Sequence, residues 1–224
     1  MTMDASMFRA WIHEAARLVA ENADHLTRLD SAVGDADHGI NMRRGLQAAV
    51  AMLDETDPST PGAVLATVGR ALISKTGGAS GPLYGTAFRQ AAGTLGEDPD
   101  VSAAQLGAAL AAALTGIQRI GAAYEGDKTM IDALSPAVTA YQAVIDTGGD
   151  LTNATRAASD AAVRGLKQTA GMQARKGRAS YLGARTIGHE DPGAASTVLI
   201  LSALATVSSA GERRSEWPGS GAAS

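Results

Sequence analysis

The amino-acid sequence predicts an all-α protein, a bundle or barrel of about eight helices. Apolar residues recur at spacings of three and four along most of the chain, and no segment alternates convincingly between apolar and polar residues as a half-buried strand does. Alanine, the strongest helix former, dominates several of these segments. Most connections between them are short, so neighbouring helices are expected to run antiparallel. The length of 224 residues suits one domain.

The first expected helix runs from Asp4 to about Arg28, and its apolar face carries Phe8, Trp11, Ile12, Ala15, Leu18 and Val19. Apolar periodicity places further helices at residues 40–53, 62–74, 86–95, 101–120, 130–146, 151–171 and 194–209. Pro136 is expected in the first turns of its helix or at a kink. Polar or glycine-rich loops are expected at residues 30–39, 76–85 and 173–192. We therefore expect a single helical domain over residues 1–210 and a disordered tail over residues 211–224.

Composition and charge exclude several classes of protein. The chain has no cysteine, which excludes disulfides, thiolate metal sites and cysteine nucleophiles. Its net charge is −4 and its basic residues form no block, so nucleic-acid binding is not expected. Charged residues interrupt the apolar positions of the N-terminus, which is unlike a signal peptide. Small and polar residues dilute the uncharged stretches 101–118 and 194–210, which predicts buried helices, no membrane span and a cytoplasmic protein.

Three aspartates lie close together after the first expected helix. Asp30, Asp35 and Asp37 fall within eight residues, beside two glycines. Carboxylates this close repel one another unless a cation neutralises them, and hard divalent cations prefer oxygen ligands. The spacing does not match the calcium-binding EF-hand loop, which needs a glycine at its sixth position and a glutamate at its twelfth. The pattern favours Mg²⁺ that is shared with substrate phosphates, and aspartates that merely cap helices are the alternative.

A glycine-rich segment, residues 76–85, follows the third expected helix. Its glycines leave backbone N–H groups open to an anion, and the helix after it offers the positive end of its dipole. The segment does not match the P-loop pattern of nucleotide triphosphatases. Tight corners between alanine-rich helices are the alternative explanation. Next to three aspartates, a phosphate site is the favoured interpretation.

The segment of residues 177–193 mixes cations with glycines and then opens the last expected helix. Asp191 suits the N-cap of that helix, and Pro192 suits its first position. The guanidinium groups of Arg178 and Arg185 are suited to hold a phosphoryl group. A capped helix after a mobile loop is the alternative.

The segment of residues 126–132 has the pattern of a loop that leads into a helix. Within it, Met130 is a flexible apolar residue that suits the face of an adenine ring. Ordinary packing in the core is the alternative.

Four strings in the chain closely resemble the ADP-binding L subunits of the phosphoenolpyruvate-dependent dihydroxyacetone kinases. The strings are GDADHG at 34–39, GGASGPLYG at 77–85, GDKTM at 126–130, and SYLG at 180–183 followed by DPG at 191–193. They occur in the order of that family, and the resemblance covers roughly residues 5–210. Four ordered strings are far more specific than one short motif.

The resemblance implies an antiparallel eight-helix barrel with a nucleotide bound at one end. It implies that Asp30, Asp35 and Asp37 hold two Mg²⁺ ions, which bridge the phosphates of tightly bound ADP or ATP. The residues that match the nucleotide contacts of the family are His38, Gly39, Ile40, Asn41, Ala79, Ser80, Gly121, Met130, Arg178, Asp191, Pro192 and Gly193. Arg178 is also the candidate catalytic residue, a cation suited to stabilise the transferring phosphoryl group.

The resemblance also implies a function as one subunit of a phosphotransferase. A phosphoryl-donor M subunit of the phosphotransferase system would convert the bound ADP to ATP, and a sugar-binding K subunit would hold the dihydroxyacetone that receives the γ-phosphoryl group. Two alternatives stay open. One is a subunit of an ATP-exchanging kinase for dihydroxyacetone or another ketose, although such kinases carry a fused sugar-binding domain that this sequence lacks. The other is a reporter of nucleotide state that binds a transcription regulator.

Overall fold

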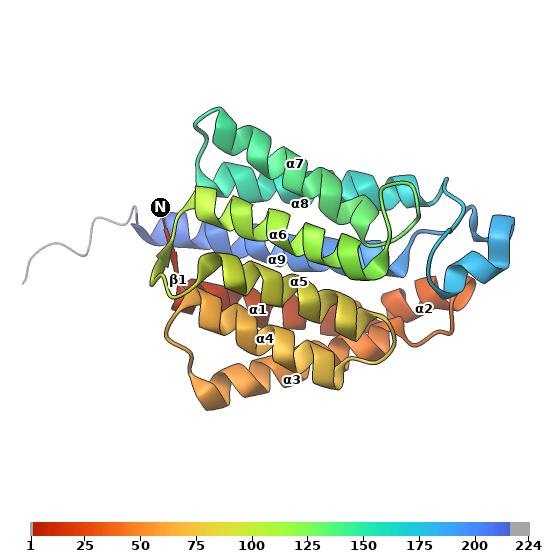
Figure 1. The fold of residues 1–224 in the computed structure, drawn as a ribbon, viewed down its shortest axis with the longest axis horizontal. Coiled ribbons are helices and arrows are strands. Elements are labelled where there is room, and N and C mark those ends of the chain that lie inside the picture. Colours follow the sequence, from red (N-terminus) through yellow and green to blue (C-terminus); the bar gives the residue numbers. More distant parts are fainter. Residues whose placement is uncertain (1, 216–224) are drawn as a thin grey trace, which may run out of the picture.

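Helices make up most of the computed structural model, which describes the backbone of residues 2–215 and the side chains of residues 2–211 (Figure 1). The α-helices are α1 (Ala5–Glu21), α2 (Ala23–Val33), α3 (His38–Thr56), α4 (Pro61–Lys75), α5 (Ser80–Leu95), α6 (Ala103–Gly121), α7 (Ile131–Asp146), α8 (Leu151–Thr169) and α9 (Pro192–Ser215). A 3₁₀ helix, η1, spans Arg178–Thr186. Two-residue strands, β1 (Met3–Asp4) and β2 (Asp100–Val101), pair antiparallel. The predicted all-α class is confirmed.

Eight of the helices in the described part of the chain form a closed antiparallel ring (Figure 1). Each packs on the next in the order α1, α3, α4, α5, α6, α7, α8 and α9, and α9 packs back on α1. The indole Nε1 of Trp11 donates to the carbonyl oxygen of Ile200 at 2.8 Å, where the ring closes. The short helix α2 stands at one end of the ring, between α1 and α3. The predicted eight-helix barrel is therefore confirmed, with α2 as an additional helix.

Apolar side chains fill the ring, and small residues let its helices approach closely. Phe8, Ile12, Leu72 and Tyr141 are fully buried. A Cβ atom at Gly165 of α8 would lie only 2.0 Å from the carbonyl oxygen of Asp132 in α7, so the backbones of these two helices touch. The interior of the barrel is therefore filled by side chains, and the ends of its helices are the places where a ligand can bind.

The observed helix ends differ from the predicted ones at the end of the barrel that carries α2. The first expected helix is broken at Asn22, whose Nδ2 donates back to the carbonyl oxygen of Leu18 at 2.8 Å. The chain then forms α2, which places Asp30 in the last helical turn rather than in a loop. Helix α5 begins at Ser80, inside the predicted loop 76–85, and η1 lies inside the predicted loop 173–192. These changes bring helix termini to the region where the sequence predicts loops.

The last helix, α9, is longer than predicted. It continues to Ser215, so the first residues of the expected tail are helical, and residues 216–224 of that tail lie outside the described residues. The stretch Pro192–Gly211 is long and apolar enough to cross a membrane by length and composition alone. Half of it is buried against the rest of the barrel.

Candidate functional site

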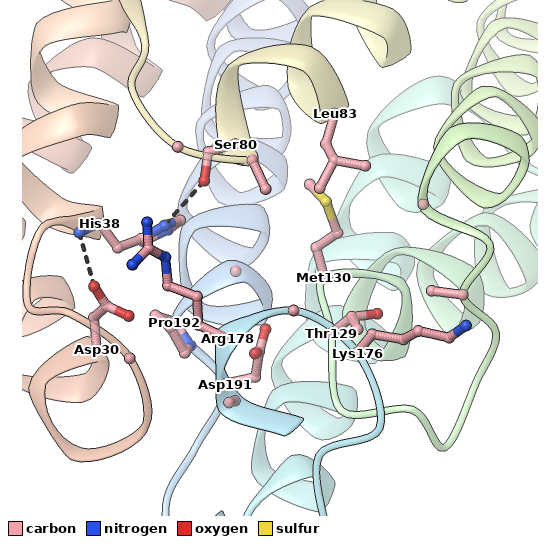
Figure 2. Close-up of a pocket in the computed structure, with 18 of the residues that line it drawn as sticks. Asp30, His38, Ser80, Leu83, Thr129, Met130, Lys176, Arg178, Asp191 and Pro192 are labelled. Atoms are coloured by element: carbon pink, nitrogen blue, oxygen red, sulfur yellow. Dashed lines mark hydrogen bonds between the residues drawn. The ribbon is translucent and has the colours of Figure 1, made fainter. Parts of the chain in front are cut away.

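A cavity of about 520 Å³ opens at the end of the barrel beside α2 (Figure 2). Its walls come from the turn between α2 and α3, the loop before α5, the end of α6, the segment before α7, the start of η1 and the turn before α9. The regions that the motifs singled out are all among them. Segments spread over more than half of the chain therefore meet in one place.

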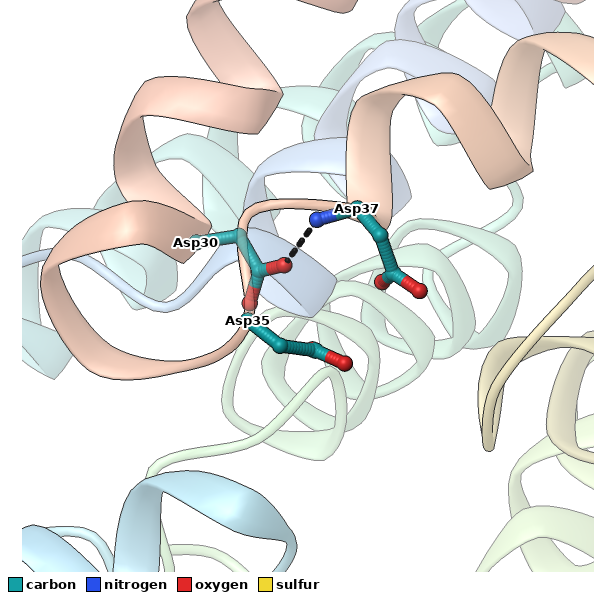
Figure 3. A group of neighbouring side chains, drawn as sticks. All are labelled: Asp30, Asp35 and Asp37. Atoms are coloured by element: carbon teal, nitrogen blue, oxygen red, sulfur yellow. Dashed lines mark hydrogen bonds between the residues drawn. The ribbon is translucent and has the colours of Figure 1, made fainter.

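The three aspartates form a cluster on one wall (Figure 3). One carboxylate oxygen from each of Asp30, Asp35 and Asp37 lies within 4.8 Å of the others. One oxygen of Asp30 accepts the backbone N–H groups of Asp37 at 2.8 Å and of His38 at 3.1 Å. The other oxygen of Asp30 lies against Gly34, where a Cβ atom would come within 2.0 Å of it. Asp30 therefore shapes the turn that presents Asp35 and Asp37.

The donor set of this cluster fits a hard divalent cation. Asp30 is buried, Asp37 is half-buried and Asp35 is exposed. The carboxylate oxygens of Asp35 and Asp37 are therefore the more accessible from the cavity. Mg²⁺ is usually held by one or two carboxylates together with waters and phosphates, which suits carboxylates on an accessible cavity wall. In the structure, Asp35 forms an ion pair with Nη1 of Arg178 at 3.0 Å. The arginine side chain is 71% exposed, so this pair contributes little stability.

The glycine loop forms a second wall of the cavity. Gly78 has a φ of 64°, in the left-handed region that favours glycine. A Cβ atom at Gly77 would lie 2.5 Å from Oδ1 of Asn41, and one at Gly81 would lie 2.5 Å from the carbonyl oxygen of Thr76. The tight-corner explanation therefore holds for Gly77 and Gly81. The anion-binding interpretation rests on Ser80, which starts α5 at the cavity wall and leaves the first N–H groups of that helix free.

His38 connects the aspartate turn to two other walls. Its Nδ1 is 3.2 Å from the hydroxyl of Ser80, and its Nε2 is 2.9 Å from the hydroxyl of Ser196 in α9. The Tyr84 hydroxyl continues the network, 2.7 Å from Ser196, and donates to the carbonyl oxygen of Gly193 at 3.0 Å. Burial lowers the pKa of His38 and raises that of Tyr84, so both are neutral near pH 7. The network thus joins three walls without adding charge.

The turn before α9 supplies the last wall. The Asp191 carboxylate accepts the N–H of Ala194 at 2.7 Å, and Pro192 is the first residue of α9, so both predicted helix-start roles are confirmed. Burial raises the pKa of Asp191 to about 7, and the nearby charge of Lys128 opposes this rise. A Cβ atom at Gly193 would lie 3.4 Å from the Cβ of Met130, so the turn packs directly on the segment before α7.

The cavity brings together most of the predicted site residues. Those that line it are Asp30, Asp35, Asp37, His38, Ala79, Ser80, Gly121, Met130, Arg178, Asp191, Pro192 and Gly193. Gly39, Ile40 and Asn41 are not among the lining residues. Gly39 is buried where α3 meets α2, Ile40 is half exposed, and Oδ1 of Asn41 accepts from Arg44 at 2.9 Å beneath the glycine loop. Their nucleotide contacts stay predictions.

Sequence reasoning missed several residues that line the cavity, namely Lys128, Thr129, Lys176, Leu83, Ile117 and Ile120. The string GDKTM contains Lys128 and Thr129, but a lysine in a polar loop has the pattern of a solvated residue. The spacing of Ile117, Ile120 and Gly121 places them on one face of α6, and this is the signal that could have predicted an apolar cavity wall. Residues that face the core have the same spacing, so the signal does not distinguish the two cases.

Replacing Asp191 by asparagine is expected to raise the free energy of unfolding much more at pH 7.5 than at pH 4.5. With its pKa raised to about 7, Asp191 holds its proton more tightly in the folded than in the unfolded chain. The proton on Asp191 therefore stabilises the folded chain. This stability is fully present below the ordinary pKa of an aspartate and is lost as the pH rises from about 4 to about 7. A rise in the pKa from about 4 to about 7 corresponds to a gain of at most about 4 kcal/mol for the variant at pH 7.5. Asparagine keeps a side-chain oxygen that can accept the N–H of Ala194, so the helix cap is retained.

Urea unfolding of both proteins at the two pH values measures this difference. Asp160→Asn, which changes an exposed aspartate of α8, is the matched control and is expected to show no such pH dependence. An Asp191→Asn effect of equal size at both pH values would contradict the prediction.

Comparison with known proteins shows the family of the chain. Residues 32–206 match the DAK2 domain. The chain is 41% identical to the ADP-binding subunit DhaL of phosphoenolpyruvate-dependent dihydroxyacetone kinase 1 from Listeria innocua, over 91% of this chain and 97% of that protein. It is 37% identical to the corresponding DhaL subunit of Escherichia coli, over 92% of this chain and 98% of that protein.

Two further comparisons involve larger proteins. The chain is 35% identical to the L-erythrulose 1-kinase of Mycolicibacterium smegmatis, over 84% of this chain but 33% of that protein. The crystal structure of the dihydroxyacetone kinase from C. freundii in complex with AMP-PNP and Mg²⁺ superposes with a TM-score of 0.68 and 26% identity, over 92% of this chain and 34% of that one. From its matched domain and its full-length relatives, we conclude that the chain belongs to the DAK2 domain family and is a relative of the ADP-binding DhaL subunits of dihydroxyacetone kinases.

Proposed function

We propose that this chain is the nucleotide-binding subunit of a dihydroxyacetone kinase and that it holds ADP with Mg²⁺ at the open end of the barrel. The observation that carries the proposal is the cluster of three aspartates that shares one cavity with the glycine loop and the N-terminus of α5. A cation site and an anion-binding helix end in one cavity suit a polyphosphate. The ADP-binding relatives support the nucleotide, and the AMP-PNP and Mg²⁺ complex of the C. freundii kinase supports both ligands.

The proposed roles of the residues follow from the walls on which they lie. Asp30, Asp35 and Asp37 would hold Mg²⁺, which when bound offsets the negative charge of the phosphates, and two ions is our sequence-based hypothesis. Backbone N–H groups at Ala79 and Ser80 would donate to phosphate oxygens. The apolar part of the cavity would take the base, and its residues are Leu83, Ile117, Ile120, Gly121 and Met130.

Arg178 is the proposed catalytic residue. It begins η1, its side chain is largely exposed, and it reaches across to Asp35 at the mouth of the cavity. A guanidinium in this position has donors to turn toward a phosphoryl group, and its planar fork suits two oxygens at once. Electrostatic stabilisation of the transferring group is the main demand of phosphoryl transfer.

The proposed reaction needs two partner subunits. A phosphoryl-donor M subunit of the phosphotransferase system would supply the phosphoryl group, and a sugar-binding K subunit would hold the dihydroxyacetone that receives it. The relatives are named as subunits of phosphoenolpyruvate-dependent or phosphotransferase-system-dependent kinases, which supports this division of labour. We place the protein in the cytoplasm, with residues 1–210 as one nucleotide-binding domain.

The two alternative functions are less favoured. The relatives that match over nearly their whole length are ADP-binding subunits, whereas the erythrulose kinases match over about a third of theirs. The ADP-binding subunits are also the more similar in sequence, which favours the proposed function over an ATP-exchanging kinase. A reporter of nucleotide state would use the same cavity, and no feature of the described residues favours a transcription regulator as its partner.

Quantifying the nucleotide that copurifies with the protein tests the proposed function. The protein is purified without added nucleotide, dialysed in Mg²⁺ and denatured with acid, and the released nucleotide is measured by chromatography. We expect close to one ADP per chain. An empty protein that binds ATP reversibly would favour the ATP-exchanging kinase, and a protein that binds neither nucleotide would overturn both interpretations.

A further inference from the structure

Lys128 is a buried cation that has no role in the proposed chemistry. Its side chain is only 1% exposed, in the loop between α6 and α7. Its φ of 61° lies in the left-handed region, which is unfavourable for a residue with a side chain. A buried ammonium group is also unfavourable unless hydrogen bonds and opposite charges replace the water that it loses. The fold therefore maintains two unfavourable features at one residue.

Backbone carbonyl groups take the place of that water, and carboxylates lie near the ammonium group. The Nζ of Lys128 donates to the carbonyl oxygen of Thr169 at 2.5 Å and also to that of His189. Burial lowers the pKa of Lys128, and nearby carboxylates oppose this by favouring its charged form, those of Asp191, Asp132 and Glu190. The ammonium is thus directed at the backbone of two distant segments.

Both of these segments support the turn that starts α9. Thr169 is the last residue of α8, and its hydroxyl accepts the backbone N–H of Asp191 at 2.9 Å. His189 lies two residues before Asp191. The contacts of Lys128 therefore fix the turn from one side through His189 and from the other through Thr169.

On the other side of Lys128 lies the segment that forms the facing wall. Thr129 and Met130 follow it directly and line the cavity (Figure 2). The Asp132 carboxylate holds this segment in shape, since it accepts the N–H of Thr129 at 2.7 Å. A Cβ atom at Gly193 would lie 3.4 Å from the backbone N of Met130, so the two walls are in contact. A shift of one wall relative to the other changes the shape of the cavity.

We infer that Lys128 is a positioning residue that ties the Met130 segment to the Asp191–Gly193 turn and so sets how tightly the cavity holds its nucleotide. The inference rests on the proposed function, because the ligand concerned is the ADP placed in this cavity. Lys128 acts indirectly. Its ammonium donates to the carbonyl groups of Thr169 and His189, and these residues hold the turn that starts α9.

The rate of ADP release tests this role. A fluorescent ADP analogue is bound in Mg²⁺ and displaced with excess ADP. Lys128→Met keeps the apolar stem but removes the ammonium, and we expect release to become faster by about 10-fold or more. Lys128→Arg keeps a cation with several donors and is expected to recover slow release in part. Lys167→Met removes an exposed lysine of α8, and we expect it to stay within about twofold of the wild type.

A second variant and a spectroscopic signature separate positioning from a general loss of stability. Thr169→Val removes the hydroxyl that accepts the N–H of Asp191, and it is expected to speed release as well. The double variant is expected to fall short of the product of the two single effects, because both loosen the same turn. In ¹H–¹⁵N spectra of the nucleotide-loaded protein, the amide signals of Asp191, Gly193 and Ala194 are expected to move in both variants but not in Lys167→Met.

The outcomes distinguish this inference from the proposed function. A folded Lys128→Met protein with a lower melting temperature, normal release and unmoved amide signals would overturn the positioning role. If Lys128→Met does not fold, Thr169→Val decides in the same way. A wild-type protein that fails to bind ADP would instead overturn the proposed function.

Discussion

Replacing Asp35 by asparagine is expected to weaken the retention of Mg²⁺ and of ADP together, with a loss of about 100-fold in nucleotide affinity. The substitution keeps the size of the side chain and removes one negative charge from a set of oxygens that lie within 4.8 Å of one another. Carboxylates and phosphates share the same cations in the proposed site, so a weaker hold on one loosens the other. Calorimetric titration with ADP at fixed Mg²⁺, together with metal analysis of the dialysed protein, measures both losses.

Asp24→Asn is the matched control for this experiment. It removes the same charge from an exposed position in α2, the helix that precedes Asp35, and we expect both ligands to bind as in the wild type. Loss of the exposed ion pair with Arg178 is expected to change the stability of Asp35→Asn by less than about 1 kcal/mol. If nucleotide stayed bound while metal left, the arrangement in which the cations bridge carboxylates and phosphates would be wrong.

Gly39→Ala is expected to destabilise the fold by about 3 kcal/mol. An added Cβ atom would lie 1.9 Å from the carbonyl oxygen of Ala23 and 2.6 Å from Oγ1 of Thr27, both in α2. A backbone carbonyl cannot swing aside as a flexible side chain can, so α2 must move away from α3. For a chain of this length, the melting temperature is expected to fall by about 6–12 °C. Nucleotide binding should weaken too, because the last turn of α2 carries Asp30.

Gly93→Ala provides a control of opposite sign. It makes the same chemical change in α5, at an exposed position where nothing lies within 4 Å of the added atom. Alanine is the better helix former, so this variant is expected to gain about 0.5–1 kcal/mol. Thermal unfolding of the two variants beside the wild type measures both effects. A Gly39→Ala protein as stable as the wild type would show that α2 and α3 do not depend on their close approach.

The ring of helices could be predicted from the sequence because apolar periodicity carries that information directly. The break at Asn22 could not, because the apolar residues before and after it continue one pattern, and the break depends on a side-chain hydrogen bond to Leu18. The consequence reaches the site. Without the separate helix α2, Asp30 was expected in a loop and Gly39 had no packing partner to explain it.

Within the site, groups that are close together in the sequence could be predicted to act together, whereas groups that are far apart in the sequence could not. Three carboxylates within a few residues indicate a cation from the sequence alone, and the structure brings Asp30, Asp35 and Asp37 together. Lys128 has no such signal, because its burial depends on carbonyl groups that lie 41 and 61 residues further along the chain. The network around His38 likewise depends on Ser196, which lies 158 residues away.

The closure of the ring by α1 and α9 has a consequence for the protein while it is being made. The hydrogen bond from Trp11 to Ile200 joins residues that are 189 positions apart, so α1 leaves the ribosome long before its partner exists. At about 5–20 residues per second, the side of α1 that α9 will cover waits for about 10 seconds or longer. The turn that begins α9 is also the last wall of the cavity to emerge. ADP can therefore select and stabilise only chains that have completed the ring, and a chain stalled before α9 presents no finished site to it.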